Sequence, residues 1–198
     1  MHLYCITILR NDKKPAQVLA ITTNLSSFGF FVRSSIYEFM MLFSRMVAEE
    51  TQVRQRRSFE QDNYVLHVYS RSEGVAGVIV CDKEYPLRVA YSLLSDLLDG
   101  FLIKYPCTSW PEQGNERLSF AMLDEYIVKY QDPKKADSIM KVQQELDDIK
   151  NVLFQTIDSV LQRGEKLDDL VQRSDILSAQ SRLFYKQAKK NNSCCNIS

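Results

Sequence analysis

The chain has 198 residues, with 25 basic and 25 acidic side chains and 45% hydrophobic residues, which is the composition of a folded globular protein. Zero formal net charge argues against a general nucleic-acid-binding protein, because binding to a polyanion requires an excess of lysine and arginine. Five cysteines and an apolar start without a basic flank or cleavage site predict a cytosolic chain that has no disulfide framework. The longest apolar stretch, 75–81, is far below the roughly 20 residues that span a bilayer.

The first hundred residues predict an α+β domain in which an antiparallel sheet has helices on its faces. Ser35 and Glu38 have the spacing of a capping box ahead of an apolar helical stripe, which predicts a first helix. Tyr85 and Pro86 open a second helix. Runs of β-branched and aromatic residues predict strands at 2–9, 16–22, 64–69 and 75–81.

A third helix is expected over 115–130, after a loop at 106–114. Pro133 ends it, since a proline inside a helix costs about 3 kcal/mol. We therefore expect four regions: a domain at 1–130, a linker at 131–137, an extended segment at 138–192 and a short tail at 193–198.

The extended segment carries an apolar seam with alternating spacings of three and four residues, which is the 3.5-residue period of a coiled coil. As one helix, the 53 residues from Ile139 to Asn191 would form a rod of roughly 80 Å, whose narrow seam needs partner helices for burial. Eleven of the sixteen seam positions are apolar. The positions are Ile139, Val142, Leu146, Ile149, Leu153, Thr156, Val160, Arg163, Leu167, Leu170, Ser174, Leu177, Ser181, Phe184, Ala188 and Asn191.

Arg163 lies at the middle of this seam. A buried guanidinium is costly unless acceptors meet its five donors, and a parallel homo-oligomer would place several arginines at one level. Uncharged acceptors such as glutamine side chains on different partner helices fit this position better. The alternative is an ordinary homodimeric coiled coil in which Arg163 reaches solvent from the rim.

The chain ends in a C-a-a-X pattern formed by Cys195, Asn196, Ile197 and Ser198, and the terminal serine is typical of farnesylation. Asn196 departs from the pattern because it is not aliphatic. One lipid gives only reversible membrane binding, so we expect a second on Cys194, either palmitoyl or another prenyl group. The last 23 residues contain four basic and no acidic side chains, which fits an end that faces an anionic membrane.

Residues 160–170 resemble the central stretch of the R-SNARE motif, and the whole chain resembles the prenylated longin-domain R-SNAREs of the Ykt class. The resemblance implies a profilin-like longin fold followed by a long C-terminal SNARE helix. It makes Arg163 the ionic layer of a four-helix bundle and the other fifteen seam positions its layers. Further stretches that carry the resemblance are 28–35, 63–69, 82–86, 130–133 and 139–146.

The resemblance implies a protein that docks and fuses transport vesicles on ER–Golgi, endosomal and vacuolar routes. Its SNARE helix would zipper with three glutamine-bearing helices, a syntaxin-type Qa together with Qb and Qc. The implied locations are the cytosol and the cytoplasmic face of Golgi, endosomal, vacuolar and vesicle membranes. Farnesyl and palmitoyl groups would be the attachment, with carboxyl methylation of Cys195 after removal of the last three residues, and no other cofactor is expected.

The predicted first helix has a wider apolar arc than packing against one sheet requires, because Met41 and Leu42 point away from the stripe. We expect Phe39, Leu42, Phe43 and Met46 to line a groove that holds the molecule's own SNARE segment, a lipid, or both. The closed cytosolic form of the family implies the same.

Two other classes of function stay open. A longin domain with a coiled coil can serve as a non-fusogenic adaptor or tether. An S-acyltransferase, an activity attributed to the family, would need a nucleophile from Cys5, Cys81 or Cys107 and a base from His2 or His67. The strand patterns around Cys5 and Cys81 favour buried, inert thiols. No phosphate loop, metal-ligand spacing or acid pair is evident in the sequence, so we expect no enzymatic activity.

Overall fold

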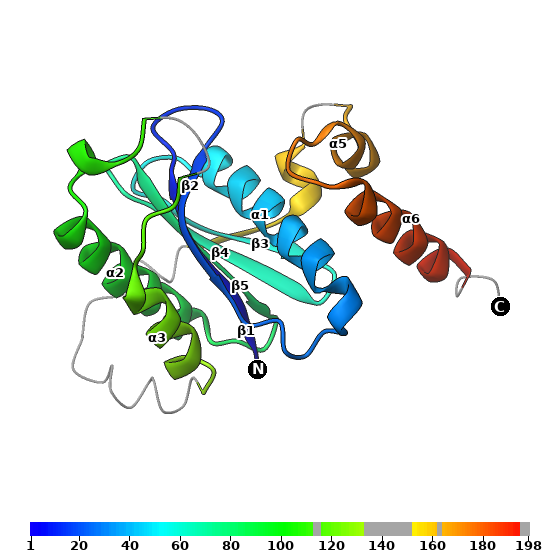
Figure 1. Cartoon of the computed structure of the whole chain (residues 1–198), viewed down its shortest axis with the longest axis horizontal. Helices are drawn as coiled ribbons and strands as arrows, with labels where there is room; N and C mark the ends of the chain where they lie inside the picture. Colours follow the sequence, from blue (N-terminus) through cyan, green and yellow to red (C-terminus); the bar gives the residue numbers. More distant parts are fainter. Residues whose placement is uncertain (113–115, 133–151, 162–163, 195–198) are drawn as a thin grey trace.

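The computed structural model describes residues 1–112, 116–132, 152–161 and 164–194, the last four of them by their backbone alone. A six-stranded sheet in the order β2-β1-β5-β4-β3-β6 forms the middle layer (Figure 1). The strands are β1 (Leu3–Arg10), β2 (Gln17–Thr23), β3 (Arg56–Gln61), β4 (Tyr64–Ser70), β5 (Val75–Asp82) and β6 (Leu153–Thr156). All neighbouring pairs are antiparallel except β3 and β6, which run parallel.

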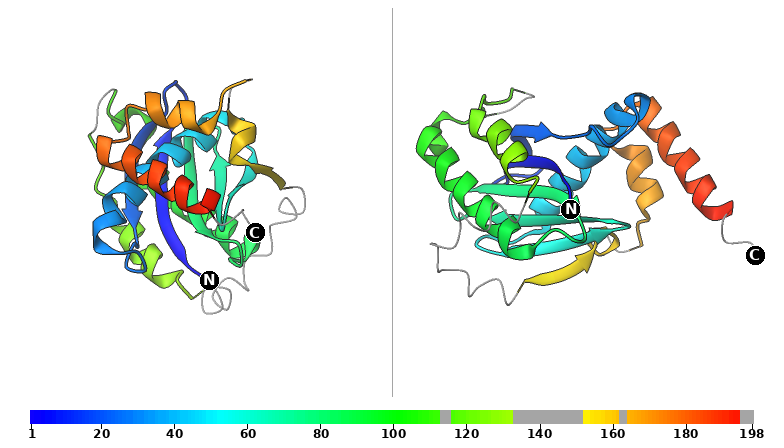
Figure 2. Two further views of the ribbon diagram at one scale, coloured as in Figure 1. Left: turned by 90° about the vertical axis from the view of Figure 1, so that its right-hand side faces the viewer. Right: turned by 90° about the horizontal axis from the view of Figure 1, so that it is seen from below.

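Helices cover both faces of the sheet, with α1 on one face and α2 and α3 on the other (Figures 1 and 2). A second, C-terminal group of helices lies beyond α1 (Figure 1). The helical elements are η1 (Phe30–Val32), α1 (Arg33–Glu50), α2 (Leu87–Lys104), η2 (Cys107–Ser109), α3 (Ala121–Lys129), η4 (Ile157–Val160), α5 (Leu167–Arg173) and α6 (Ala179–Cys194).

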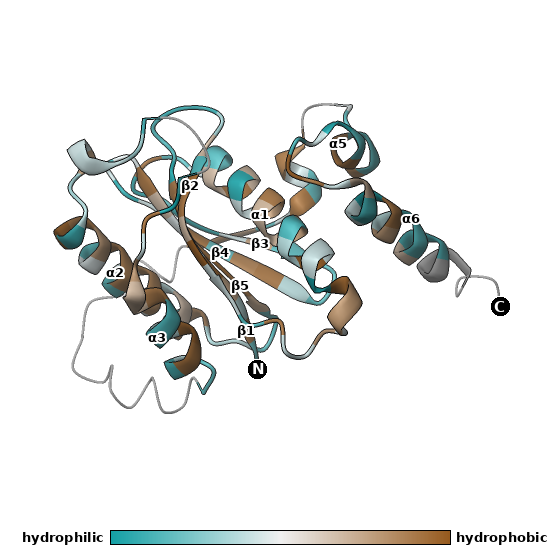
Figure 3. Ribbon diagram, in the orientation of Figure 1, coloured by the Kyte–Doolittle hydropathy of each residue, from teal (hydrophilic) through white to brown (hydrophobic). Residues whose placement is uncertain are grey.

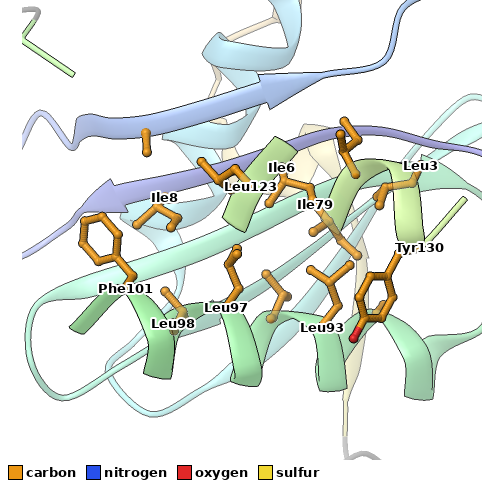
Figure 4. Close-up of a cluster of buried hydrophobic side chains, with 14 of the residues drawn as sticks. Leu3, Ile6, Ile8, Ile79, Leu93, Leu97, Leu98, Phe101, Leu123 and Tyr130 are labelled. Atoms are coloured by element: carbon orange, nitrogen blue, oxygen red, sulfur yellow. The ribbon is translucent and has the colours of Figure 1, made fainter. Parts of the chain in front are cut away.

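The main core lies between the sheet and α2, where apolar side chains of β1 and β5 meet those of α2 and α3 (Figure 4). Central strand β5 is buried along nearly its whole length, as expected for a strand covered on both faces. Figure 3 accordingly shows β4, β5 and α2 as predominantly hydrophobic. At Gly77 the helix and the strand approach closely, since an added Cβ would lie 2.9 Å from Leu94 Cδ2.

The predicted α+β architecture and its strands are confirmed. The capping box is wrong: α1 begins at Arg33, directly after the η1 turn, so Ser35 and Glu38 lie inside the helix. The predicted third helix is shorter than 115–130, because residues 116–120 are not helical and the Leu118 N–H donates to the Leu19 carbonyl of β2. Strand β3 has no clear signal, since Phe59 is its only apolar residue.

The C-terminal segment differs most from the sequence expectation. Its described residues do not form one rod but a strand, a 3-10 turn and two helices, β6, η4, α5 and α6. The physical reason is that, without partner helices, part of the seam packs on the rest of the molecule. Among the described residues, no helix is long and apolar enough to cross a bilayer.

The close approach at Gly77 gives a stability prediction. We expect Gly77→Val to lower the free energy of unfolding by about 1–3 kcal/mol, because the added methyl groups overpack the contact with Leu94 and Leu98. Gly29→Val is the matched control, as an added Cβ there meets nothing within 4 Å and should change stability by less than about 0.5 kcal/mol. Urea unfolding followed by circular dichroism measures both. Equal stability of the two variants would show that the close packing of β5 on α2 is wrong.

Candidate functional site on the first helix

The outer face of α1 is covered by the C-terminal segment. Leu42 of α1 is buried in a cluster with Val171 of α5 and Leu177, the residue two before α6. Helix α6 lies against α1 (Figures 1 and 2). Six partly buried residues pack against these three: Phe39, Met46, Leu167, Leu170, Ile176 and Tyr185. We call all nine residues together the clasp cluster.

The spacing of apolar residues on α1 explains how one helix serves two partners. Met40 and Val47 face the sheet and belong to its core. Phe39, Leu42 and Met46 are spaced by three and four residues, so they share an adjacent face of the helix. That second face carries the C-terminal segment, and α1 is therefore packed between two layers.

The segment also extends the sheet. Strand β6 pairs with β3, with Arg57 opposite Leu153 and Glu60 opposite Thr156. The turn after it places Ile157, which is fully buried, in the core between the sheet and α1. An otherwise open strand edge is thus covered by the molecule's own chain.

Hydrogen bonds fix the start of α6 on α1. The Ser178 N–H donates to Glu38 Oε2 over 2.7 Å, and the Ser178 hydroxyl accepts from the Ser181 N–H over 3.2 Å. Burial alone would raise the pKa of Glu38, but the hydrogen bonds from Ser181 and Ser178 outweigh it and hold that pKa below its ordinary value of 4.5. A carboxylate at the amino end of a helix is also favoured by the helix dipole.

Polar contacts join α5 to α6. The Tyr185 hydroxyl donates to Asp168 Oδ1 over 2.8 Å, and Lys189 pairs with the same carboxylate. Arg182 donates to the carbonyls of Val171 and Ser174, over 3.3 and 2.7 Å. These bonds occupy carbonyls at the end of α5, so the two helices dock on α1 as one unit.

An apolar cavity of about 200 Å³ lies between α1, the sheet and α6. Its position beside α6 places it on the same helix that ends at Cys194. The Phe39 and Tyr185 rings on its wall lie 5.9 Å apart between centroids. Other lining residues include Phe43, Tyr64, Leu167, Phe184 and Ala188.

The predicted site residues differ in how far they are buried in the structure. Among the seam positions, Ser174, Leu177 and Ser181 are buried, Leu167, Leu170, Phe184 and Ala188 are half-buried, and Leu153 is 50% exposed. Val160 packs beside Ile157 in the core between the sheet and α1. Phe39, Leu42 and Met46 contact the C-terminal segment. The predictions on Ile139, Val142, Leu146, Ile149, Arg163 and Cys195, and on the side chains of Asn191 and Cys194, lie outside the described residues.

Sequence reasoning missed three residues of this site. Ile157 and Val171 are fully buried, and Tyr185 packs on Phe39, yet none of the three occupies a seam position. Apolar or aromatic residues off the seam would face solvent in a coiled coil, which is the signal that could have identified them.

Two of the three candidate catalytic thiols, those of Cys5 and Cys81, are buried in the core. Cys5 Sγ lies 3.3 Å from the Thr7 hydroxyl, and Cys81 Sγ lies 3.7 Å from the Val65 carbonyl. Burial raises the pKa of the Cys5 thiol to about 12 and also raises that of Cys81, so neither becomes a thiolate near neutral pH. Burial lowers the pKa of His67 to about 3. Cys107 is exposed.

Comparisons with known proteins identify the family. The Longin model, a regulated-SNARE-like domain, matches residues 25–127, and the synaptobrevin model matches residues 138–196. The chain is 64% identical to the synaptobrevin homolog ykt6 of Schizosaccharomyces pombe and 53% identical to that of Saccharomyces cerevisiae, in each case over the full length of both proteins. The chain belongs to the Ykt6 family of synaptobrevin homologues. A longin domain followed by a synaptobrevin segment is therefore confirmed, and with it membership of the SNAREs, a class of vesicle-transport proteins that are not enzymes.

In this Ykt6 family member, the carboxylate of Glu38 predicts how docking depends on pH. Because its pKa is lowered in the folded state, it stabilises the docked α6 above the unfolded pKa, and this contribution is lost as pH falls through the folded value. We expect hydrogen exchange of the α6 amides to accelerate below about pH 4.5 more steeply in the wild type than in Glu38→Gln. The variant should already exchange faster at neutral pH, because the neutral amide oxygen of glutamine accepts a weaker hydrogen bond than a carboxylate does. Glu125→Gln, an exposed carboxylate on α3, is the control, and identical profiles for both variants contradict the role of Glu38.

Proposed function

We propose that this chain is a vesicular R-SNARE that docks and fuses transport vesicles by zippering with three Q-SNARE helices, a syntaxin-type Qa with Qb and Qc. The synaptobrevin match over residues 138–196 supports this, since it contains the seam and Arg163. Burial of the seam against three foreign helices would supply the free energy that draws two bilayers together. The proposed sites are the Golgi, endosomal, vacuolar and vesicle membranes, reached from the cytosol.

The closed arrangement carries the proposal of autoinhibition. Leu167, Leu170 and Leu177 are seam positions, and all three belong to the clasp cluster on α1. The same side chains cannot pack on α1 and in a four-helix bundle at once. The longin domain therefore competes with the Q-SNARE helices, and zippering requires that the C-terminal segment leave α1.

Lipid anchoring is the second part of the proposal. Cys195 would carry the farnesyl group and the methylated carboxyl end, and Cys194 a palmitoyl or second prenyl group. The cavity of about 200 Å³ beside α6 offers apolar surface close to the helix that ends at Cys194. A lipid shielded there in the cytosol would become available when α6 undocks, which would couple release of the SNARE segment to membrane attachment.

The off-seam residue Val171 allows a test that leaves the layers intact. We expect Val171→Asp to release the segment, because a charge forced into an apolar site costs several kcal/mol, whereas in the four-helix bundle the side chain would face solvent. Leu42→Glu should do the same from the α1 side. Both should increase the rate of assembly with soluble Q-SNARE helices at least about tenfold, since every 1.4 kcal/mol changes the closed population by that factor.

The matched control is Leu183→Asp, which introduces the same charge in α6 at a side chain that is 60% exposed. Protease protection and hydrogen exchange over residues 153–190 report docking directly. Unchanged protection in both Val171→Asp and Leu42→Glu would overturn autoinhibition, whatever the assembly rates.

Arg163 separates a fusion protein from a tether. We expect Arg163→Ala to lower the melting temperature of the four-helix complex and to slow lipid mixing between liposomes, because the glutamines of the ionic layer lose their donors. Gln162→Ala, next to the seam but outside it, should leave both unchanged. Lipid mixing at the wild-type rate by Arg163→Ala would favour the tether.

A further inference from the structure

A second cleft, away from the clasp cluster, has no part in the function proposed so far. It encloses about 590 Å³ between the β1–β2 hairpin, α1 and the connection between α5 and α6. This volume is within the range of small-molecule sites. Five basic and two acidic side chains line it, a formal charge of plus three, although the chain as a whole is neutral. The basic residues are Arg10, Lys13, Lys14, Arg45 and Arg117, and the acidic ones are Glu112 and Asp175.

Fixed contacts hold these cations around the cleft. The hairpin is tied to α1 because the Ala16 N–H donates to Glu49 Oε1 over 2.7 Å, one turn after Arg45. On the other side, the guanidinium of Arg117 lies over the Tyr37 ring, 5.7 Å from its centroid, and Nη2 lies 3.4 Å from Met41 Sδ. Tyr37, Met41 and Arg45 follow at four-residue spacing along α1, so Arg117 and Arg45 flank Met41.

Most of this positive charge has no fixed counterion. Arg10 is the exception, because its guanidinium is paired with the Asp12 carboxylate, with two of its nitrogens 2.7 and 2.9 Å from the carboxylate oxygens. Within the described ranges, Lys13, Lys14 and Arg117 form no ion pair. Arg45 Nε is buried without a hydrogen-bond partner among these residues, and Arg45 Nη1 lies 3.5 Å from Asp175, whose side chain is 83% exposed. Such a long, exposed pair is a weak interaction.

We propose that this cleft binds a compact polyphosphate, the chemistry shared by a soluble inositol phosphate and the headgroup of an inositol phospholipid. Arginine binds phosphate with paired hydrogen bonds, and lysines add point charges. Cations on three elements match several phosphate groups on one small scaffold better than a single phosphate. Glu112 lies near Arg10, at the side of the cleft where the positive charge is already neutralised, so the ligand is placed at Lys13, Lys14, Arg45 and Arg117.

The ligand would also loosen the closed form, a consequence that rests on the proposed function. Asp175 belongs to the C-terminal segment, and a phosphate on Arg45 replaces this carboxylate and repels it. By linkage, binding of the ligand favours release of the segment, and release of the segment tightens binding of the ligand. All four cations lie within residues 13–117, so the site persists when the segment has left.

Calorimetric titration of the purified full chain with inositol trisphosphate at physiological ionic strength tests the site. We expect saturable binding that Arg45→Gln/Arg117→Gln weakens at least about tenfold through lost charge-assisted hydrogen bonds. Lys13→Gln/Lys14→Gln should also weaken it, and this pair is exposed in the hairpin, so the fold is retained. The control, Lys83→Gln/Lys129→Gln, removes the same charge away from the cleft. No saturable binding, or an equal loss in the control, overturns the proposal.

Liposomes distinguish the two sources of phosphate. The protein is co-sedimented with phosphatidylcholine vesicles that contain either phosphatidylinositol bisphosphate or phosphatidylserine at equal total charge. If more protein binds the phosphatidylinositol bisphosphate vesicles, the cleft is assigned to the lipid headgroup. Binding of soluble inositol trisphosphate without that preference assigns it to a free inositol phosphate. Equal binding to both kinds of vesicle and none to the soluble probe overturns a defined site.

The coupling has its own test. We expect Asp175→Asn to bind inositol trisphosphate roughly fivefold more tightly, because the competing carboxylate is gone. The probe should accelerate hydrogen exchange of α6 in the wild type and have no further effect in Leu42→Glu. Binding without a change in exchange of the wild type overturns the coupling and leaves the cleft standing. A Leu42→Glu variant that exchanges like the wild type instead contradicts the closed form, while calorimetry still decides the cleft.

Discussion

The structure depends on where the apolar side chains of the C-terminal segment are buried. An extended segment whose apolar side chains lie mainly along one seam cannot bury them against itself, so it needs a partner of comparable apolar area. In this structure α1 is that partner, and Leu42, Val171 and Leu177 form the buried centre of the contact. Helix α1 can pack against both the sheet and the C-terminal segment, because it has apolar residues on the face turned toward the sheet and on the neighbouring face. A helix that only covered a sheet would carry a polar side chain at Leu42, which belongs to the contact with the C-terminal segment alone.

In the proposed function, docking on α1 and zippering with other SNARE helices would use overlapping but unequal sets of residues. Leu167, Leu170 and Leu177 would serve both, which would make the two states exclusive. Ile157 and Val171 serve the docked state alone, since they are buried here and would face solvent in a coiled coil. Leu153, a seam position, is half exposed in the docked state. On this proposal one sequence encodes two structures, and the balance between them could be altered at off-seam positions without changing the layers proposed to contact other SNARE helices.

Much of the domain follows from local rules, and the C-terminal conformation does not. Strands β1, β4 and β5 were predictable from their apolar runs, and the outer face of α1 from Leu42 and Met46. Strand β3 lacked such a signal, because its stability comes from pairing with β4 and β6 on either side. Residues 153–156 carry a helical period yet form β6, since docking gives their backbone a strand edge in place of a helix. A period of 3.5 specifies which side chains need burial, but it says nothing about whether partner helices or the molecule's own domain provide it.

The apolar contact alone would leave the docked state insensitive to its surroundings, because hydrophobic burial responds weakly to ions and ligands. The docked state is sensitive to charge at the short connection between α5 and α6, because two charged side chains of α1 contact this connection. Glu38 of α1 accepts a hydrogen bond from the Ser178 N–H. Arg45 of α1 pairs with Asp175, which precedes Ser178 by three residues. These two contacts lie beside the buried Leu177 and hold the connection that carries it. On these proposals, a proton on Glu38 or a phosphate on Arg45 would act where a local change of charge alters the position of an apolar anchor, and this placement would couple weak polar contacts to release of the whole segment.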